Sequence, residues 1–127
     1  MNFVARAISR RTFASTRPVL GKVFDLGDKS EISGILQESP NLLVDFHASW
    51  CGPCKMMDPW LKNVIAQEDD VNLLKIDVDE FEDISLDFQV RAMPTVVFLK
   101  NGDEVNRFVG ARDESGIKEF IVNSMER

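Results

Sequence analysis

A strand-like apolar run leads into a pair of cysteines, and this stretch constrains the chain more than any other. Residues 42–46 are almost all apolar, and Cys51 and Cys54 follow them three positions apart. Apolar side chains then recur at helical spacing, which predicts a strand-to-helix junction at the cysteines. At a helix N-terminus, unpaired N–H groups and the positive end of the dipole favour a thiolate. Because a second thiol at this spacing can attack a mixed disulfide formed on the first, the stretch indicates redox chemistry.

Two other uses of the cysteine pair fit the sequence less well. A structural zinc site takes four ligands, usually cysteine and histidine, whereas the chain has two cysteines and one histidine. A disulfide kept for stability alone would contribute little here, because its effect grows with the length of the loop that it closes. Redox chemistry is therefore the favoured interpretation, and no metal is expected.

Length and charge fit one acidic domain preceded by a basic arm. The chain has 127 residues, 44% of them hydrophobic, and no apolar run is long enough to span a bilayer. Every acidic residue lies at Asp25 or later, and five basic residues precede it. Removing those five charges from the net charge of −6 leaves −11 for residues 23–127. A body this acidic argues against binding to a nucleic-acid backbone, and no membrane association is expected.

The basic arm has the composition of a targeting segment. Residues 1–22 are rich in arginine, contain serine and threonine, and lack acidic residues. This pattern is typical of a mitochondrial transit peptide, so we expect residues 1–22 to be removed and residues 23–127 to form the working domain. The residues from Arg11 onward resemble processing-protease sites, with cuts after Phe13 or after Leu20. The alternative is a basic arm without a targeting role.

Strands and helices are expected to alternate along the rest of the chain. Hydrophobic periodicity and turn signals place strands at residues 42–46, 71–78, 96–99 and 105–109, the last two joined by an Asn-Gly hairpin turn. Helices are expected after Asp28, where a capping box stands, after Cys54, around residues 81–88 and after Asp113. The last helix should turn Ile117, Phe120, Ile121 and Met125 toward the core. This alternation predicts a mixed sheet covered by helices on both faces.

Several motifs resemble those of the thioredoxin family, in the family's order. They are Val44-Asp45-Phe46 leading into Trp50-Cys51-Gly52-Pro53-Cys54, then Met93-Pro94-Thr95 before a strand, and Val109-Gly110. The resemblance extends from residue 23 to the C-terminus. It implies the α/β thioredoxin fold, in which a central five-stranded mixed sheet is flanked by four helices. His47 resembles the animal mitochondrial branch of the family.

Two charged residues interrupt the predicted strands. A lone buried carboxylate is costly, so Asp45 is either neutralised by local hydrogen bonds or kept as a proton acceptor below the thiols. The resemblance supports the acceptor, which we favour. The resemblance also implies that Lys75 lies near Asp45, where an ion pair would lower the cost of burying both. The alternative for Lys75 is a side chain whose ammonium group reaches water.

The resemblance implies roles for the other site residues. Cys51 is expected to be the exposed attacking thiolate, and Cys54 the resolving thiol that gives its proton to Asp45. The Met93–Pro94 bond is expected to be cis and to face the cysteines. A shallow, mostly uncharged substrate groove is expected around Cys51, formed by Trp50, Gly52, Pro53, Met93, Pro94, Gly110 and Ala111.

The resemblance also implies a function. The expected activity is that of a dithiol–disulfide oxidoreductase that reduces protein disulfides and binds no cofactor itself. Its electrons would come from NADPH through thioredoxin reductase, peroxiredoxins would be among its partners, and its location would be the mitochondrial matrix. A second hypothesis is a redox-gated binding protein that holds partners only in its reduced form. Turnover separates the two, because an enzyme needs both cysteines.

Overall fold

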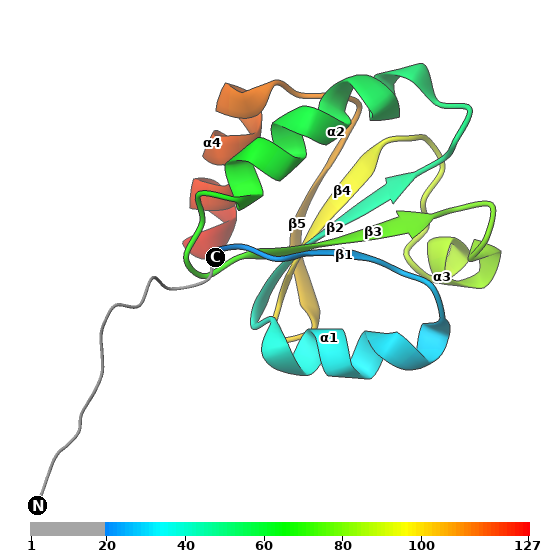
Figure 1. The fold of residues 1–127 in the computed structure, drawn as a ribbon, viewed down its shortest axis with the longest axis horizontal. Coiled ribbons are helices and arrows are strands. Elements are labelled where there is room, and N and C mark those ends of the chain that lie inside the picture. The colour runs from blue at the N-terminus through cyan, green and yellow to red at the C-terminus, as the bar shows by residue number, and fades with distance from the viewer. Residues whose placement is uncertain (1–19) are drawn as a thin grey trace, which may run out of the picture.

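The computed structural model describes residues 20–127, which build a five-stranded sheet with helices on both faces (Figure 1). The strands are β1 (Val23–Asp25), β2 (Asn41–His47), β3 (Asn72–Asp77), β4 (Thr95–Lys100) and β5 (Asp103–Val109). The helices are α1 (Ile32–Glu38), α2 (Gly52–Ile65), α3 (Glu82–Asp87) and α4 (Glu114–Met125), and a short turn η1 (Lys29–Glu31) precedes α1. The predicted mixed sheet and four helices are confirmed.

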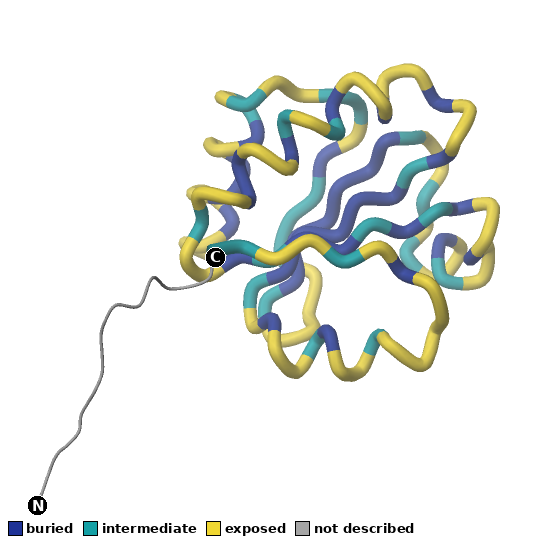
Figure 2. Tube along the Cα trace, viewed as in Figure 1, coloured by how far each residue is buried: buried dark blue, intermediate teal, exposed yellow. Residues whose placement is uncertain are grey.

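The strand that leads to the cysteines lies at the centre of the sheet. The strand order is β1-β3-β2-β4-β5. β3 runs parallel to both β1 and β2, whereas β4 is antiparallel to β2 and β5 is antiparallel to β4. β2 is therefore hydrogen-bonded on both sides, and the central strands are buried along most of their length (Figure 2). This position fixes the direction in which the chain enters the cysteine pair.

The sheet separates two apolar cores. Leu42, Val44 and Phe46 belong to the core that includes Ile35 of α1, while Leu43 belongs to the core that α2 and α4 cover. Because successive side chains of a strand point to opposite faces, Asp45 shares the face of Leu43 and lies on the α2 side. Figure 1 shows α2 and α4 together on that side, with α1 on the other.

The helix starts follow the sequence signals. The side chain of Asp28 accepts a hydrogen bond from the Ser30 amide at 2.9 Å, and Glu31 Oε1 accepts one from the Asp28 amide at 3.3 Å. This capping box confirms the predicted start, although the first turn is a 3-10 turn and α1 begins at Ile32. Asp113 caps α4 with its side chain alone, which accepts a 2.9 Å hydrogen bond from the Gly116 amide.

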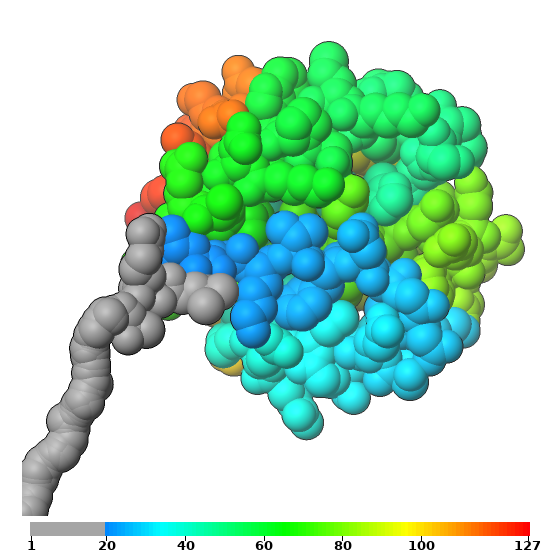
Figure 3. All heavy atoms as spheres, viewed as in Figure 1, coloured from blue at the N-terminus to red at the C-terminus, as the bar shows by residue number. Residues whose placement is uncertain are grey.

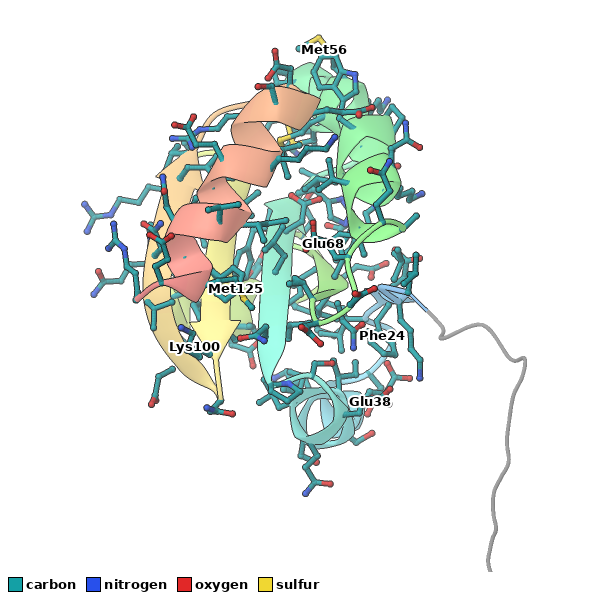
Figure 4. All side chains as sticks on the ribbon, turned by 90° about the vertical axis from the view of Figure 1, so that its left-hand side faces the viewer. Phe24, Glu38, Met56, Glu68, Lys100 and Met125 are labelled. Atoms are coloured by element: carbon teal, nitrogen blue, oxygen red, sulfur yellow. A yellow bond between two sulfur atoms is a disulfide. The ribbon has the colours of Figure 1, made fainter. Side chains whose placement is uncertain are left out.

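Two features differ from the sequence expectations. The sequence pattern does not predict β1, because the strand has three residues and only its middle residue is partly buried. In α4 the buried positions are Ile117, Phe120, Ile121 and Ser124, and Met125 is 37% exposed. The prediction for Met125 is therefore wrong. Its backbone carbonyl instead accepts a 2.8 Å hydrogen bond from Lys100 Nζ, and the two residues lie at the same end of the molecule (Figure 4).

Residues 21 and 22 pack against the body as part of the fold. The Gly21 amide donates a 2.8 Å hydrogen bond to the Glu68 carbonyl, and the Lys22 carbonyl accepts one of 2.8 Å from the Leu73 amide. A Cβ atom at Gly21 would lie 2.2 Å from the Ile65 carbonyl oxygen, so this position requires glycine. Figure 3 shows the segment around β1 between α1 and α2. Residues 1–19 of the predicted leader lie outside the described residues.

Candidate active site

The two cysteines form a disulfide at the start of α2. Their Cα atoms are 5.3 Å apart. Cys51 is the N-cap of the helix, and its Sγ accepts a hydrogen bond of 3.2 Å from the Cys54 amide. Pro53 stands in the first turn, where a missing N–H costs nothing. The helix start therefore directs an N–H group and its positive dipole end at Cys51.

The exposure of the two cysteines differs from the expectation. In the disulfide form Cys51 is 4% exposed and Cys54 is 5% exposed, so neither is an open surface thiol. The expectation that Cys51 is the exposed cysteine is wrong for this state. The two sulfurs differ instead in their surroundings, because Cys51 faces the helix start and Cys54 lines a cavity below it.

The surface next to the disulfide is open and partly aromatic. Gly52 and Pro53 are exposed, and Trp50 is 66% exposed. The indole N–H of Trp50 donates a 3.0 Å hydrogen bond to Oδ2 of Asp79, which fixes the ring beside the disulfide loop. An exposed and anchored indole of this kind is suited to contact with another molecule rather than to core packing.

The loop that contains Pro94, called the proline loop here, leads directly into β4. The Met93–Pro94 bond is cis, as the resemblance implied. Met93 packs against the apolar cluster that contains both cysteines, while Ala111 packs against the opposite core. Gly110 has a φ of +94° and its amide donates a 2.9 Å hydrogen bond to the Pro94 carbonyl, which joins the two loops. Pro94 itself is buried, so its backbone and Met93 are what this loop can present.

A cavity of about 230 Å³ lies below the disulfide on the α2 side of the sheet. It brings together three predicted site residues: Asp45, Cys54 and Lys75. Its other lining residues are His47, Ala48, Ser49, Lys55 and Asp58. A polar cavity in contact with one of the two cysteines provides a place where a proton can be exchanged with its sulfur.

The carboxyl group of Asp45 is the buried acid of this cavity. Asp45 is 2% exposed, and its Oδ1 has no hydrogen-bond partner among residues 20–127. Burial raises the pKa of Asp45 to about 7, against the opposing effect of the Lys75 ammonium group and with a further increase from the Asp58 carboxylate. Near neutral pH this group can therefore both accept and donate a proton.

Lys75 is bound to a residue that sequence reasoning missed. Its Nζ lies 2.5 Å from Oδ1 of Asp58, and its side chain is 13% exposed. Neither alternative considered for Lys75, a partner in Asp45 or an ammonium in water, describes this arrangement. Asp58 also pairs with Lys62 at 3.0 Å. The spacing in the sequence could have indicated Asp58, because it follows Cys54 by four residues and so lies on the same helix face.

Two negative findings apply to the described part of the chain. Among residues 20–127, no group of three histidine, cysteine, aspartate or glutamate side chains is arranged to hold a metal ion. Within the same residues, no helix is both long and apolar enough to cross a membrane. The disulfide at a helix start, above a cavity with a buried acid, defines a dithiol–disulfide oxidoreductase.

Comparisons with known proteins agree with this class. A thioredoxin family model matches residues 24–123. Rat mitochondrial thioredoxin is 39% identical over 113 residues, covering 87% of this chain and 68% of the relative. Mitochondrial thioredoxin-3 of Saccharomyces cerevisiae is 37% identical over 123 residues, or 94% of each chain.

Solved structures show the same relationship. A mutant thioredoxin from Halobacterium salinarum superposes with a TM-score of 0.77 at 31% identity, covering 90% of this chain and 98% of that one. A structure from work on thiol resolution in a yeast mitochondrial 1-Cys peroxiredoxin by glutathione and thioredoxin systems has a TM-score of 0.71 at 36% identity, covering 80% and 94%. The chain belongs to the thioredoxin family, and its Cys51–Cys54 pair makes it a protein-disulfide reductase.

Proposed function

We propose that Cys51 attacks the substrate and that Cys54 resolves the intermediate. The observation that carries this assignment is the hydrogen bond from the Cys54 amide to Cys51 Sγ. In the reduced protein that contact stabilises a thiolate on Cys51. The thiolate attacks one sulfur of a substrate disulfide, forms a mixed disulfide with it, and releases the other substrate sulfur as a thiolate.

In the second step of this proposal, Asp45 takes the proton of Cys54. The Cys54 sulfur then attacks Cys51 Sγ, so that the Cys51–Cys54 disulfide forms and the second substrate sulfur leaves as a thiolate. The shared cavity and the pKa of Asp45 near 7 support this role, because an acid of ordinary pKa would hold the proton far less readily. The ammonium group of Lys75 adds a positive charge to the cavity, where it pairs with the carboxylate of Asp58.

The substrate is proposed to lie across the surface between Trp50 and the proline loop. The exposed indole of Trp50 and the backbone of Gly52 and Pro53 form one side of this surface, and the side chain of Met93 belongs to the proline loop opposite. Pro94, Gly110 and Ala111 form the other, joined by the hydrogen bond between Gly110 and Pro94. A groove of this composition selects for a disulfide in an accessible chain segment more than for a particular sequence.

The electron supply and the partners are proposed from the family. We infer that NADPH reduces the Cys51–Cys54 disulfide through a thioredoxin reductase, and that peroxiredoxins are among the substrates. The similar structure connected with a yeast mitochondrial peroxiredoxin supports the second point. The test is insulin-disulfide reduction with reductase and NADPH, comparing the wild-type protein with Cys51→Ser and Cys54→Ser. Partner binding that survives both substitutions without any turnover would favour redox-gated binding instead.

The segment before the domain is proposed to direct the protein to the mitochondrial matrix. The basic composition of residues 1–22 supports this, as do relatives that are mitochondrial thioredoxins. Both predicted cuts, after Phe13 and after Leu20, keep the contacts of Gly21 and Lys22 with the body. Import of a reporter fused to residues 1–22, with N-terminal sequencing of the imported full chain, tests both the destination and the cut.

A further inference from the structure

Asp58 shares the cavity with the proposed proton acceptor but has no assigned role in the reaction. Its carboxylate contacts two ammonium groups, through Oδ1 to Lys75 at 2.5 Å and through Oδ2 to Lys62 at 3.0 Å. Burial raises the pKa of Asp58, but the two ammonium groups outweigh it and hold the pKa below its usual range. Asp58 is therefore a fixed negative charge at neutral pH.

The ammonium group of Lys75 does not contact the residue that lies opposite Lys75 in the sheet. The register of β2 and β3 pairs Asp45 with Lys75, and neighbouring strands lie only about 4.8 Å apart. Two opposite charges on adjacent positions of one buried face would ordinarily meet. Instead the Lys75 ammonium group binds Asp58 of α2, and Asp45 Oδ1 is left without a hydrogen-bond partner in the described chain.

We propose that Asp58 is a positioning residue, whose carboxylate holds the Lys75 ammonium group at the α2 wall of the cavity and so prevents a salt bridge between Lys75 and Asp45. Four charged or titratable side chains share the cavity with Asp45: Lys75 from β3, Asp58 and Lys55 from α2, and His47 from β2 itself. Burial and the nearby Lys75 lower the pKa of His47, which leaves this ring neutral at pH 7. Of these groups, Lys75 and Asp58 are the two whose charges act on Asp45.

The arrangement matters because the acid must hold a proton during part of the cycle. A salt bridge to Lys75 would fix Asp45 as a carboxylate and lower its pKa. With Lys75 held by Asp58, the pKa of Asp45 stays close to neutral pH. The carboxyl group can then exchange a proton with Cys54 in either direction. The effect on turnover rests on the proposed role of Asp45, whereas the effect on its titration does not.

A carboxyl titration measures the effect directly. We would follow the side-chain carbon of Asp45 by NMR as a function of pH in the oxidised full chain, for wild type, Asp58→Asn, Lys75→Met and the double variant. In Asp58→Asn the midpoint should fall by about one pH unit or more, because Lys75 becomes free to approach Asp45. In the Lys75→Met background the same substitution should have a clearly smaller effect.

Two controls separate positioning from general charge or folding effects. Asp58→Glu keeps the carboxylate and should retain most of the wild-type midpoint. Asp69→Asn removes an exposed carboxylate beyond the end of α2 and should leave it unchanged. An unchanged or higher midpoint in Asp58→Asn would overturn the proposal. Equal shifts with and without Lys75 would also overturn it, since Asp58 would then act only through its own charge.

A kinetic experiment tests the positioning role of Asp58 separately from the proton-acceptor role of Asp45. The rate of mixed-disulfide resolution is recorded against pH for Asp58→Asn and for Asp45→Asn. A profile that moves to lower pH in Asp58→Asn, together with a slow reaction in Asp45→Asn, supports both. A reaction as fast as wild type in Asp45→Asn would reject the proton-acceptor role, while the titration would still decide whether Asp58 positions Lys75.

Discussion

The backbone amide of Cys54 donates a hydrogen bond to the sulfur of Cys51, with 3.2 Å between the two atoms. The same turn that closes the disulfide therefore supplies a donor to only one of its sulfurs. Since residue exposure does not distinguish the cysteines, this contact and the cavity beneath Cys54 are what support the unequal roles that we propose for them.

Replacing each cysteine should give different products. Cys51→Ser should abolish turnover without trapping partners, because the attacking thiolate is lost. Cys54→Ser should accumulate stable mixed disulfides on Cys51, because the resolving thiol is absent. Mass spectrometry of proteins captured from a mitochondrial extract measures this. Trapping by Cys51→Ser alone would mean that the two roles are exchanged.

Asp45→Asn should stabilise the oxidised protein at neutral pH. Ionising a carboxyl group with almost no exposed surface opposes folding, so its removal should add ~1–3 kcal/mol to the free energy of unfolding. Denaturant melts at pH 7 measure the difference. Resolution of the mixed disulfide, followed by stopped-flow tryptophan fluorescence, should become slower in the same variant.

The stabilisation by Asp45→Asn should depend on pH in a defined direction. The pKa of Asp45 is about 7 in the folded chain and about 3.8 when unfolded, so the native state binds more protons between these values. Wild-type stability should therefore fall as pH rises from 4 to 7 and level off above. The advantage of Asn should shrink toward pH 4. A variant that is less stable at every pH and equally fast would show a structural role only.

Gly21→Ala should destabilise the full chain although the residue precedes the first strand. The added Cβ would meet the carbonyl oxygens of Ile65 and Val71 at 2.2 and 2.5 Å, and the expected cost is ~1–3 kcal/mol. Gly34→Ala is the matched control, because a Cβ there meets no atom within 4 Å and alanine favours the helix. Thermal melts compare the two. Equal stability for Gly21→Ala and wild type would remove Gly21 from the folded domain.

Trp50→Ala should separate function from stability. Trp50 is 66% exposed, so its loss should change the free energy of unfolding by less than ~0.5 kcal/mol. The kcat/KM for a protein disulfide should fall by about tenfold if the indole contacts the substrate. Val122→Ala, at an exposed position of α4, should leave both quantities unchanged. A Trp50→Ala protein with unaltered kcat/KM would place the substrate elsewhere.

The sequence carried most of the fold because its signals are local. The capping box at Asp28, the cysteine pair at a helix start and the Asn-Gly hairpin each depend on nearby residues only. β1 could not be predicted, because three residues are too few to show a hydrophobic periodicity. The segment becomes a strand only through its pairing with β3. Such an element is fixed by tertiary contacts that no short pattern encodes.

The candidate site was predictable in its residues but less so in its contacts. The motif indicated Cys51, Cys54 and Asp45, yet the predicted exposure of Cys51 was wrong, because both cysteines belong to a buried apolar cluster in the disulfide form. The partner of Lys75 was missed because strand register pairs it with Asp45, while the helix above provides a closer carboxylate in Asp58. Competition between two acids for one ammonium group depends on side-chain reach, which a sequence does not specify.

The two outer strands of the sheet have a consequence for how the protein meets other chains. β1 offers only three residues at one edge, and β5 carries Asp103, Glu104 and Arg107 at the other. Short or charged edges resist the addition of a further strand from another polypeptide. A reductase encounters many protein segments in succession, and open edges would retain them after the reaction. Blunted edges leave the cysteine pair as the place where contact begins, and formation of the Cys51–Cys54 disulfide as the step that ends it.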